Sequence, residues 1–116
     1  MKIPKEVYRY AEYEMYHYTS YKRELSAPPE KMRYLNEFQN IKNMADVTKA
    51  IDNALLMLND GHRRLFHYIY LNGRKDIYGI CMDLGISDRT YWNYKKDLVN
   101  MVAVEMGMVP LSVCNL

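Results

Sequence analysis

Polar residues between Ser87 and Lys96 have the types and spacing of a helix face that could read DNA. If a helix begins at Ser87, these side chains project outward together: Ser87, Asp88, Arg89, Trp92, Asn93 and Lys96. An arginine can bond bidentately to guanine, and an asparagine can bond in the same way to adenine. Lysines and the free N–H groups of a helix N-terminus suit phosphates. The chemistry that this segment predicts is therefore recognition of duplex DNA.

Two sets of contacts follow from this pattern. The residues that we expect at base edges are Asp88, Arg89, Trp92 and Asn93. Asp88 has two open roles, because it could accept from cytosine or favour the positive end of the helix. Trp92 could pack on a sugar or a thymine methyl group, or it could be half-buried against a helix predicted over residues 61–72. The residues that we expect at phosphates are Arg74, Lys75, Ser87, Lys95 and Lys96.

A helical hairpin would hold this face in place. One helix is predicted over residues 77–84, capped by Asp76, and the next runs from its N-cap Ser87 to about Met106. Gly85 would supply the positive φ that a tight turn between them needs. The residues predicted to form the turn and its core are Ile80, Cys81, Leu84, Gly85, Ile86, Tyr91 and Tyr94.

The rest of the chain is also predicted to be helical. We expect an unbroken helix over residues 5–25, ended by Ser26-Ala27-Pro28-Pro29, and another over 45–58. Residues 30–43 are ambiguous, and Asp60 is predicted to cap a helix over 61–72. No segment alternates polar and apolar residues as a strand would. The predicted fold class is all-α, a small domain of about five helices with a C-terminal helix-turn-helix.

Two regions are predicted within this fold. Residues 1–43 would form a Tyr-rich N-terminal helix and a proline-broken connector, and residues 44–116 would form the DNA-binding region. The two regions could make one compact unit or two subdomains.

The composition limits other functions. The 116 residues carry 16 basic and 14 acidic side chains, so DNA contact must come from local placement of charge rather than from the net charge of +2. Cys81 and Cys114 are far apart and join no Cys/His cluster, which predicts no metal site. No catalytic motif includes His17, His62 or His67, so we expect neither an enzyme nor a cofactor.

Nothing in the sequence indicates a membrane or an export signal. Apolar runs such as residues 54–58 are far shorter than the roughly 20 residues of a membrane-spanning helix. The first residues, MKIPKEVYRY, have no apolar core of the kind that a signal peptide needs. We therefore expect a cytoplasmic protein with no membrane partner.

The chain resembles a known family most specifically over residues 54–107. The two stretches NALLMLNDGHRRLFHYIYLNG and DIYGICMDLGISDRTYWNYKKDLVNMVAVEMGM carry the resemblance. They resemble the DNA-binding end of phage-encoded transcription regulators of the RinA/ArpU kind, whose helix-turn-helix is similar to region four of bacterial sigma factors. The matching positions are Leu55, Leu58, Leu65, Phe66, Leu71, Leu84-Gly85-Ile86-Ser87 and Leu98.

The resemblance implies a regulator that binds duplex DNA and activates phage or prophage genes, such as late or packaging genes, in the bacterial cytoplasm. RNA polymerase is then an implied partner. A second copy of the chain is another, because helix-turn-helix dimers bind two half-sites. Tyr91 and Trp92 stand where the family usually has a small residue, so the resemblance carries over no base preference. The operator, and the choice between activation and repression, stay open.

Two other functions stay open as well. A protein-interaction adaptor would use the N-terminal helix, which has six tyrosines between Tyr8 and Tyr21, as its docking face. A small-terminase-like packaging protein would keep DNA as its partner and assemble into rings. The tyrosines could pack on the chain's own second helix, form a surface for a dimer or polymerase, or stack on single-stranded nucleic acid. The glutamates at positions 6, 12, 14 and 24 oppose the last of these roles.

Overall fold

Every regular element that the structure describes is a helix, as predicted. The structure is a computed structural model in which residues 3–26 and 35–113 are described. The proline stop at 27–29, residues 30–34 of the ambiguous stretch, and Cys114 lie outside these residues. The elements in chain order are α1 (Lys5–Tyr16), α2 (Tyr18–Leu25), α3 (Leu35–Met57), α4 (Asp60–Phe66), the π-helix η2 (His67–Leu71), α5 (Ile77–Leu84), α6 (Asp88–Glu105) and the 3-10 helix η3 (Leu111–Val113).

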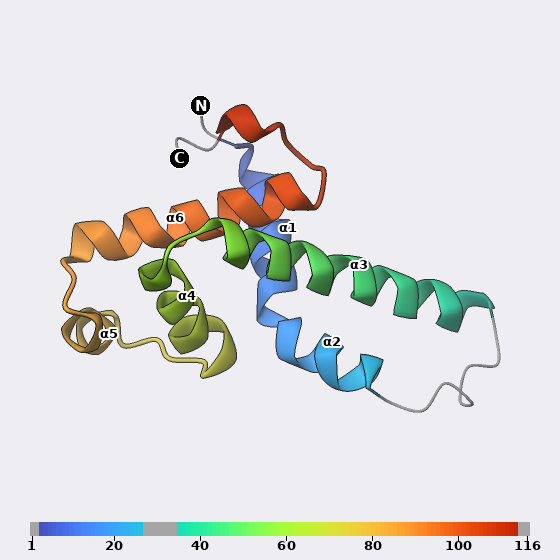
Figure 1. The fold of residues 1–116 in the computed structure, drawn as a ribbon, viewed down its shortest axis with the longest axis horizontal. Helices are drawn as coiled ribbons and strands as arrows, with labels where there is room; N and C mark the ends of the chain where they lie inside the picture. The colour runs from blue at the N-terminus through green and yellow to red at the C-terminus, as the bar shows by residue number, and fades with distance from the viewer. Residues whose placement is uncertain (1–2, 27–34, 114–116) are drawn as a thin grey trace.

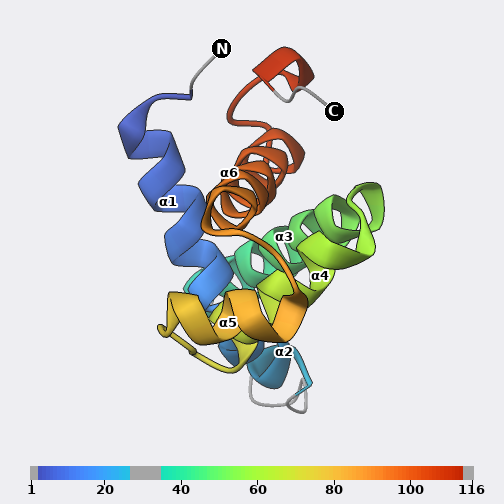
Figure 2. The same cartoon turned by 90° about the vertical axis from the view of Figure 1, so that its left-hand side faces the viewer.

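Helix α6 is the centre of the fold. Figure 1 shows α4 and α5 beneath its N-terminal half, with α2 and the first half of α3 extending away on the other side as an arm. In Figure 2 the view runs along α6, with α1 on one side of it and α3 and α4 on the other. The C-terminal half of α6 is the buried half, with almost fully buried side chains at Leu98, Val99, Met101, Val102 and Ala103.

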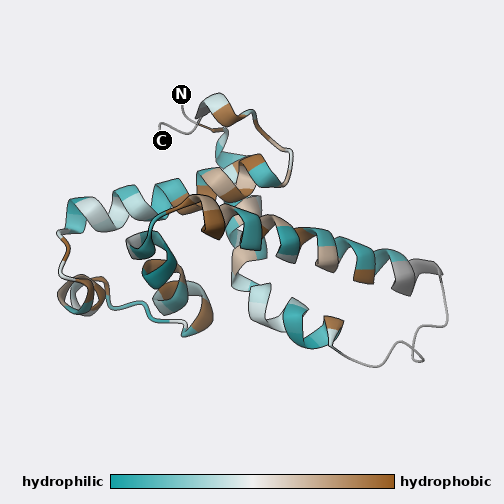
Figure 3. Ribbon diagram, in the orientation of Figure 1, coloured by the Kyte–Doolittle hydropathy of each residue, from teal (hydrophilic) through white to brown (hydrophobic). Residues whose placement is uncertain are grey.

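The two halves of α6 also differ in polarity. Figure 3 shows hydrophilic residues in the N-terminal half and apolar residues where α6 crosses α1 and α3. Helix α6 packs against α1, α3, α4 and α5, and burial of its apolar half supplies the hydrophobic stabilisation that fixes it in the fold. The polar half is thereby held in place, and its outward side is left exposed to solvent. Within the described residues no helix is long and apolar enough to cross a membrane.

The unbroken helix predicted over residues 5–25 is wrong, because it divides at His17 into α1 and α2. The His17 backbone N–H bonds to the Glu14 carbonyl, three residues back, instead of to the Tyr13 carbonyl. The ring Nδ1 of His17 lies 2.8 Å from that Tyr13 oxygen and takes the place of the backbone donor. A side chain therefore replaces one helical hydrogen bond, and no proline or glycine marks the break in the sequence.

Helix α3 begins well before the predicted residue 45, since residues 35–43 are part of it. The boundary predicted between residues 43 and 44 thus falls inside a continuous helix. Helix α2 packs along α3, where the Tyr18 hydroxyl donates to Asp52 and the Lys22 ammonium lies 2.8 Å from the same carboxylate. Ile51 and Ala54 in the second half of α3 are buried, and so is Leu58 directly after it.

The N-cap of α4 differs from the predicted one. Asn59, not Asp60, is the N-cap, and its side-chain oxygen accepts from the His62 backbone N–H at 3.0 Å. Asp60 instead lies in the first turn, where its negative charge suits the positive end of the helix. Arg63 of α4 donates from Nη1 to the carbonyls of Leu55 and Leu58. It thus caps the C-terminal end of α3.

Candidate nucleic-acid interface

The junction between α5 and α6 has the predicted backbone. Gly85 has φ +67°, and a Cβ at this position would meet nothing within 4 Å, so backbone conformation alone requires glycine. The Ile86 N–H bonds to the Cys81 carbonyl at 3.0 Å and closes the end of α5. Ser87 is the N-cap of α6, and its hydroxyl accepts from the Thr90 N–H at 3.1 Å. The turn residues Ile86 and Ser87 therefore form hydrogen bonds with backbone groups at the end of α5 and the start of α6.

Most residues predicted for the hairpin core are buried or half-buried. Ile80, Cys81 and Tyr91 are buried. Leu84, Ile86 and Tyr94 are half-buried and pack against the same core. Burial, together with the nearby Asp88 carboxylate, raises the pKa of the Cys81 thiol, which keeps it protonated at neutral pH. The thiol lies 3.8 Å from the Ser87 carbonyl oxygen, so Cys81 fills the space where the two helices approach.

The outward face of α6 presents the predicted base-reading side chains to solvent. Asp88, Arg89 and Asn93 are exposed, and so is the 52%-exposed Trp92. The Trp92 ring meets the Tyr91 ring edge to face, with centroids 5.0 Å apart. Of the two positions left open for Trp92, the structure therefore places it outside rather than against α4. Its indole is accessible to a ligand and is held by Tyr91 beneath it.

The residues predicted at phosphates fall into two groups. Lys75, Ser87 and Lys96 are exposed. Arg74 already bonds to two carboxylates, with contacts of 2.7 Å to both Asp76 and Asp83. These contacts raise the pKa of Arg74 and lower the pKa of Asp76.

Asp76 also corrects a prediction. It occupies the N-cap position of α5 but makes no side-chain cap bond, because its carboxylate faces Arg74. Lys95 is likewise engaged, 3.3 Å from Glu12 of α1, with its ammonium 5.4 Å from the centre of the Trp92 ring. Among the lysines of this end of the molecule, Lys96 and Lys75 thus have the ammonium groups most open to a phosphate.

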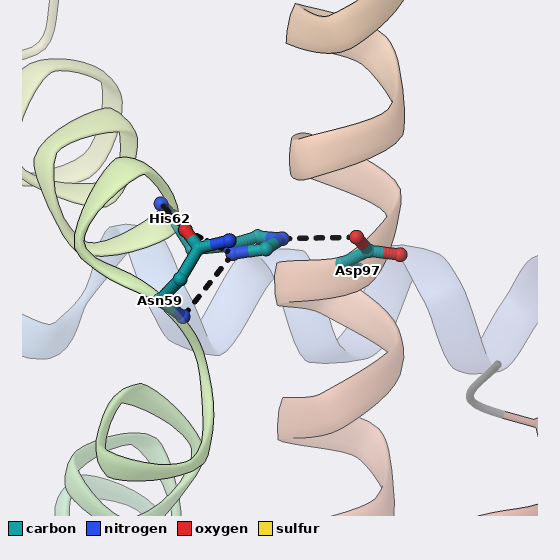
Figure 4. Close-up of polar contacts among 3 residues, drawn as sticks. All are labelled: Asn59, His62 and Asp97. Carbon is teal, nitrogen blue, oxygen red and sulfur yellow. Dashed lines mark hydrogen bonds and ion pairs between the residues drawn. The ribbon is translucent and has the colours of Figure 1, made fainter. Parts of the chain in front are cut away.

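A polar cluster around the buried His62 joins α6 to α4, and the sequence did not reveal it. His62 is 4% exposed, and its Nε2 donates to the Asp97 carboxylate at 2.9 Å. Its Nδ1 lies 2.8 Å from the Asn59 side-chain oxygen. Figure 4 shows the imidazole between Asn59 at the start of α4 and Asp97 on α6. His62 is therefore a positioning residue that sets where α6 lies.

The spacing of Asn59 and His62 is a local signal for this cluster. An N-cap residue followed three positions later by a side chain that returns to it is a capping box, usually with glutamate or glutamine in the second position. Histidine can fill the same role and has a second ring nitrogen left for Asp97. The identity of Asp97 as that partner depends on tertiary structure, since the two residues are 35 positions apart.

No protein-family model, curated protein or solved structure matches this chain. The described residues contain no group of three or more histidine, cysteine, aspartate or glutamate side chains that could hold a metal ion. The candidate site is thus the outward side of α6, a capped helix that presents polar, aromatic and basic side chains there.

Proposed function

We propose that the chain binds duplex DNA through the outward face of α6 and regulates transcription. In this proposal α5 and α6 form a helix-turn-helix, with α6 as the recognition helix in the major groove. The observation that carries the proposal is the contrast within α6. Its inward polar residues are bonded to neighbouring helices, whereas Arg89, Asn93 and Lys96 are exposed on one side.

The spacing of these three residues suits the task. Arg89, Asn93 and Lys96 follow one another at steps of four and three residues, which places them in one row along a helix. Arg89 would bond to guanine and Asn93 to adenine, while Trp92 beside them would contact a sugar or a thymine methyl group. Asp88 would contact cytosine or support the helix end, and Ser87 and Lys96 would contact phosphates.

The resemblance to phage regulators supports a role in controlling phage or prophage genes. RNA polymerase and a second copy of the chain are the protein partners that such a role would involve. Because Arg74 and Lys95 are engaged by carboxylates, we assign them at most a secondary part in phosphate contacts.

DNA binding can be tested with the single tryptophan of the chain. A duplex site would first be selected from a random-sequence library. The protein would then be titrated with that labelled duplex at several salt concentrations, following DNA anisotropy and Trp92 emission. We expect binding that weakens steeply with salt, because phosphate contacts release counterions, and a change in Trp92 emission. A protein that binds no duplex even at low salt would contradict the proposal.

Two matched arginine variants would show whether α6 is the reading helix. Arg89→Ala should weaken binding to the selected site by about 1–3 kcal/mol and relax the base preference at one position. Arg23→Ala removes another exposed arginine, from α2, and should leave both affinity and preference unchanged. Equal losses in the two variants would mean that net charge, not recognition by α6, drives the binding.

A protein-docking function has its own supporting observation. Tyr10, Tyr13 and Tyr16 of α1 are 49%, 55% and 50% exposed, and tyrosine is favoured at protein interfaces. If duplex DNA is not bound, these tyrosines become the leading candidate surface. Tyr10→Ala combined with Tyr13→Ala should then abolish partner capture, while Arg89→Ala should leave it intact.

A further inference from the structure

A groove lies between the first turns of α1 and the middle of α6. Its volume is about 530 Å³. Its polar lining consists of three cationic side chains, one carboxylate, one tyrosine and one amide. These residues are Lys5, Arg9, Lys96, Glu12, Tyr8 and Asn100. We call it the α1–α6 groove. Lys96 is the only one of these residues that the sequence pattern assigns to DNA.

The charge of the groove is more positive than its lining suggests. The Glu12 carboxylate accepts from the Tyr70 hydroxyl at 2.7 Å and lies 3.3 Å from the Lys95 ammonium. Its negative charge is therefore largely matched from the side facing the core. Lys5, Arg9 and Lys96 are exposed and form no ion pair with a described residue. The groove thus presents unmatched positive charge, which favours an anion.

The groove continues the outward face of α6. Asn100 follows Lys96 by four residues, so Arg89, Asn93, Lys96 and Asn100 form one row along the helix. With a rise of about 1.5 Å per residue, this row is roughly 16 Å long. The major groove of DNA is only about 12 Å wide, so the end of the row near Asn100 would lie over the phosphate backbone.

Asn100 itself suits an anionic ligand at this place. The residue is only 4% exposed and lines the α1–α6 groove, so packing holds its side chain at the groove wall. Asparagine amides are among the side chains that donate hydrogen bonds to phosphate oxygens of DNA. Asn100 would therefore add a neutral donor, fixed in position, beside the two cations of α1.

We propose that the α1–α6 groove seats a backbone phosphate of duplex DNA, held by Lys5, Arg9 and Lys96, at the edge of the major groove that α6 enters. This inference rests on the proposed function. It makes α1 part of the DNA-binding surface, so that the N-terminal region and α6 contact the same duplex.

Paired charge-removing variants test the groove. Lys5→Gln with Arg9→Gln should reduce the slope of log Kd against log salt concentration by about 0.9 for each phosphate that is no longer neutralised. Between 50 and 200 mM salt, Kd should then rise about 3- to 4-fold less than it does for the wild type. The control, Arg23→Gln with Lys42→Gln, removes the same two charges from exposed positions on the arm and should keep the wild-type slope. Circular dichroism would verify that both variants are folded.

Ethylation of single phosphates locates the contact. The wild type should lose binding when one phosphate flanking the bases read by α6 is ethylated, and the Lys5→Gln/Arg9→Gln variant should be insensitive to that ethylation. If the wild type binds and depends on Arg89, but the groove variant keeps the wild-type slope and ethylation pattern, only the groove inference is overturned. If the wild type binds no duplex at all, both the proposed function and the groove inference are overturned.

Discussion

The polar residues on the two sides of α6 differ in their contacts: those on the inward side are paired with other helices, and those on the outward side are exposed. On the inward side, Asp97 pairs with His62 of α4, and Lys95 pairs with Glu12 of α1. On the outward side, Arg89 and Lys96 project into solvent. Both sides contain charged residues at ordinary helical spacing, so composition alone does not separate them. The difference lies in what the neighbouring helices bring to each side.

This contrast suggests that the polar residues of α6 have two roles, one structural and one in binding. Polar groups that meet partners inside the molecule stabilise and orient α6, because burying them unpaired would cost free energy. Polar groups without a partner among the described residues contribute little to the stability of the fold, so their row is accessible to a ligand. Inward substitutions should therefore lower stability. Under the proposed function, outward substitutions should change DNA binding while stability is kept.

The largest effect on stability is expected from His62→Ala. The variant loses a buried ring that packs 4.2 Å from the Tyr94 ring, and it leaves Asp97 without its partner. We expect the free energy of unfolding to fall by about 2–3 kcal/mol. Urea unfolding followed by circular dichroism would measure it. His67→Ala, at an exposed position of the next turn, serves as the control and should be near neutral. A similar loss in both variants would contradict the role given to the His62–Asp97 contact.

Tyr70→Phe comes next, because it removes one hydroxyl from the inward network. Tyr70 is 4% exposed, and its hydroxyl donates to Glu12 at 2.7 Å, while burial and this carboxylate raise the pKa of Tyr70. Loss of a hydrogen bond to a charged group should lower the free energy of unfolding by about 1.5 kcal/mol. Tyr78→Phe changes a 76%-exposed tyrosine and should have no measurable effect. Thermal melts of the two variants would compare them directly.

The sequence predicts well those parts of the fold that local chemistry controls. The Gly85 turn, the Ser87 cap and the apolar residues Ile80 and Tyr91 are all expected, because each depends on its own backbone conformation or on helical spacing. The break at His17 is not expected, because helix propensity hardly distinguishes a histidine that stays in a helix from one that bonds to the carbonyl four residues back.

The polar networks of the candidate site are harder to predict. The pairing of Lys95 with Glu12 and of His62 with Asp97 joins residues far apart in the chain, so spacing could not reveal it. Arg74 and Lys96 also look alike in the sequence, although the Arg74 guanidinium lies between two aspartates. The α1–α6 groove likewise exists only once the two helices cross.

Gly85→Ala probes the turn that sets the position of the outward face. A Cβ would fit there without a clash, but φ +67° is strained for alanine. We expect a loss of about 1 kcal/mol in the free energy of unfolding, measured by urea titration. Gly85→Asn should lose less, because asparagine tolerates the left-handed conformation better than alanine. If alanine were as stable as glycine, the turn would have relaxed, and the relative placement of α5 and α6 would no longer depend on Gly85.

The adjacent lysines Lys95 and Lys96 provide the sharpest test of the comparison, with the smallest expected effects. The side chain of Lys95 is 17% exposed and paired with Glu12, so Lys95→Ala should lower the free energy of unfolding by about 0.5–1 kcal/mol and leave the salt dependence of DNA binding unchanged. Lys96→Ala should keep the stability, weaken binding to all duplex sequences about equally, and reduce the salt slope by about 0.9. Unfolding curves and salt titrations on both variants would separate the two roles.

If the slopes fell equally, Lys95 would leave Glu12 when DNA binds, and the inward side of α6 would not be purely structural. A sequence-selective loss for Lys96→Ala would instead place that lysine at a base edge.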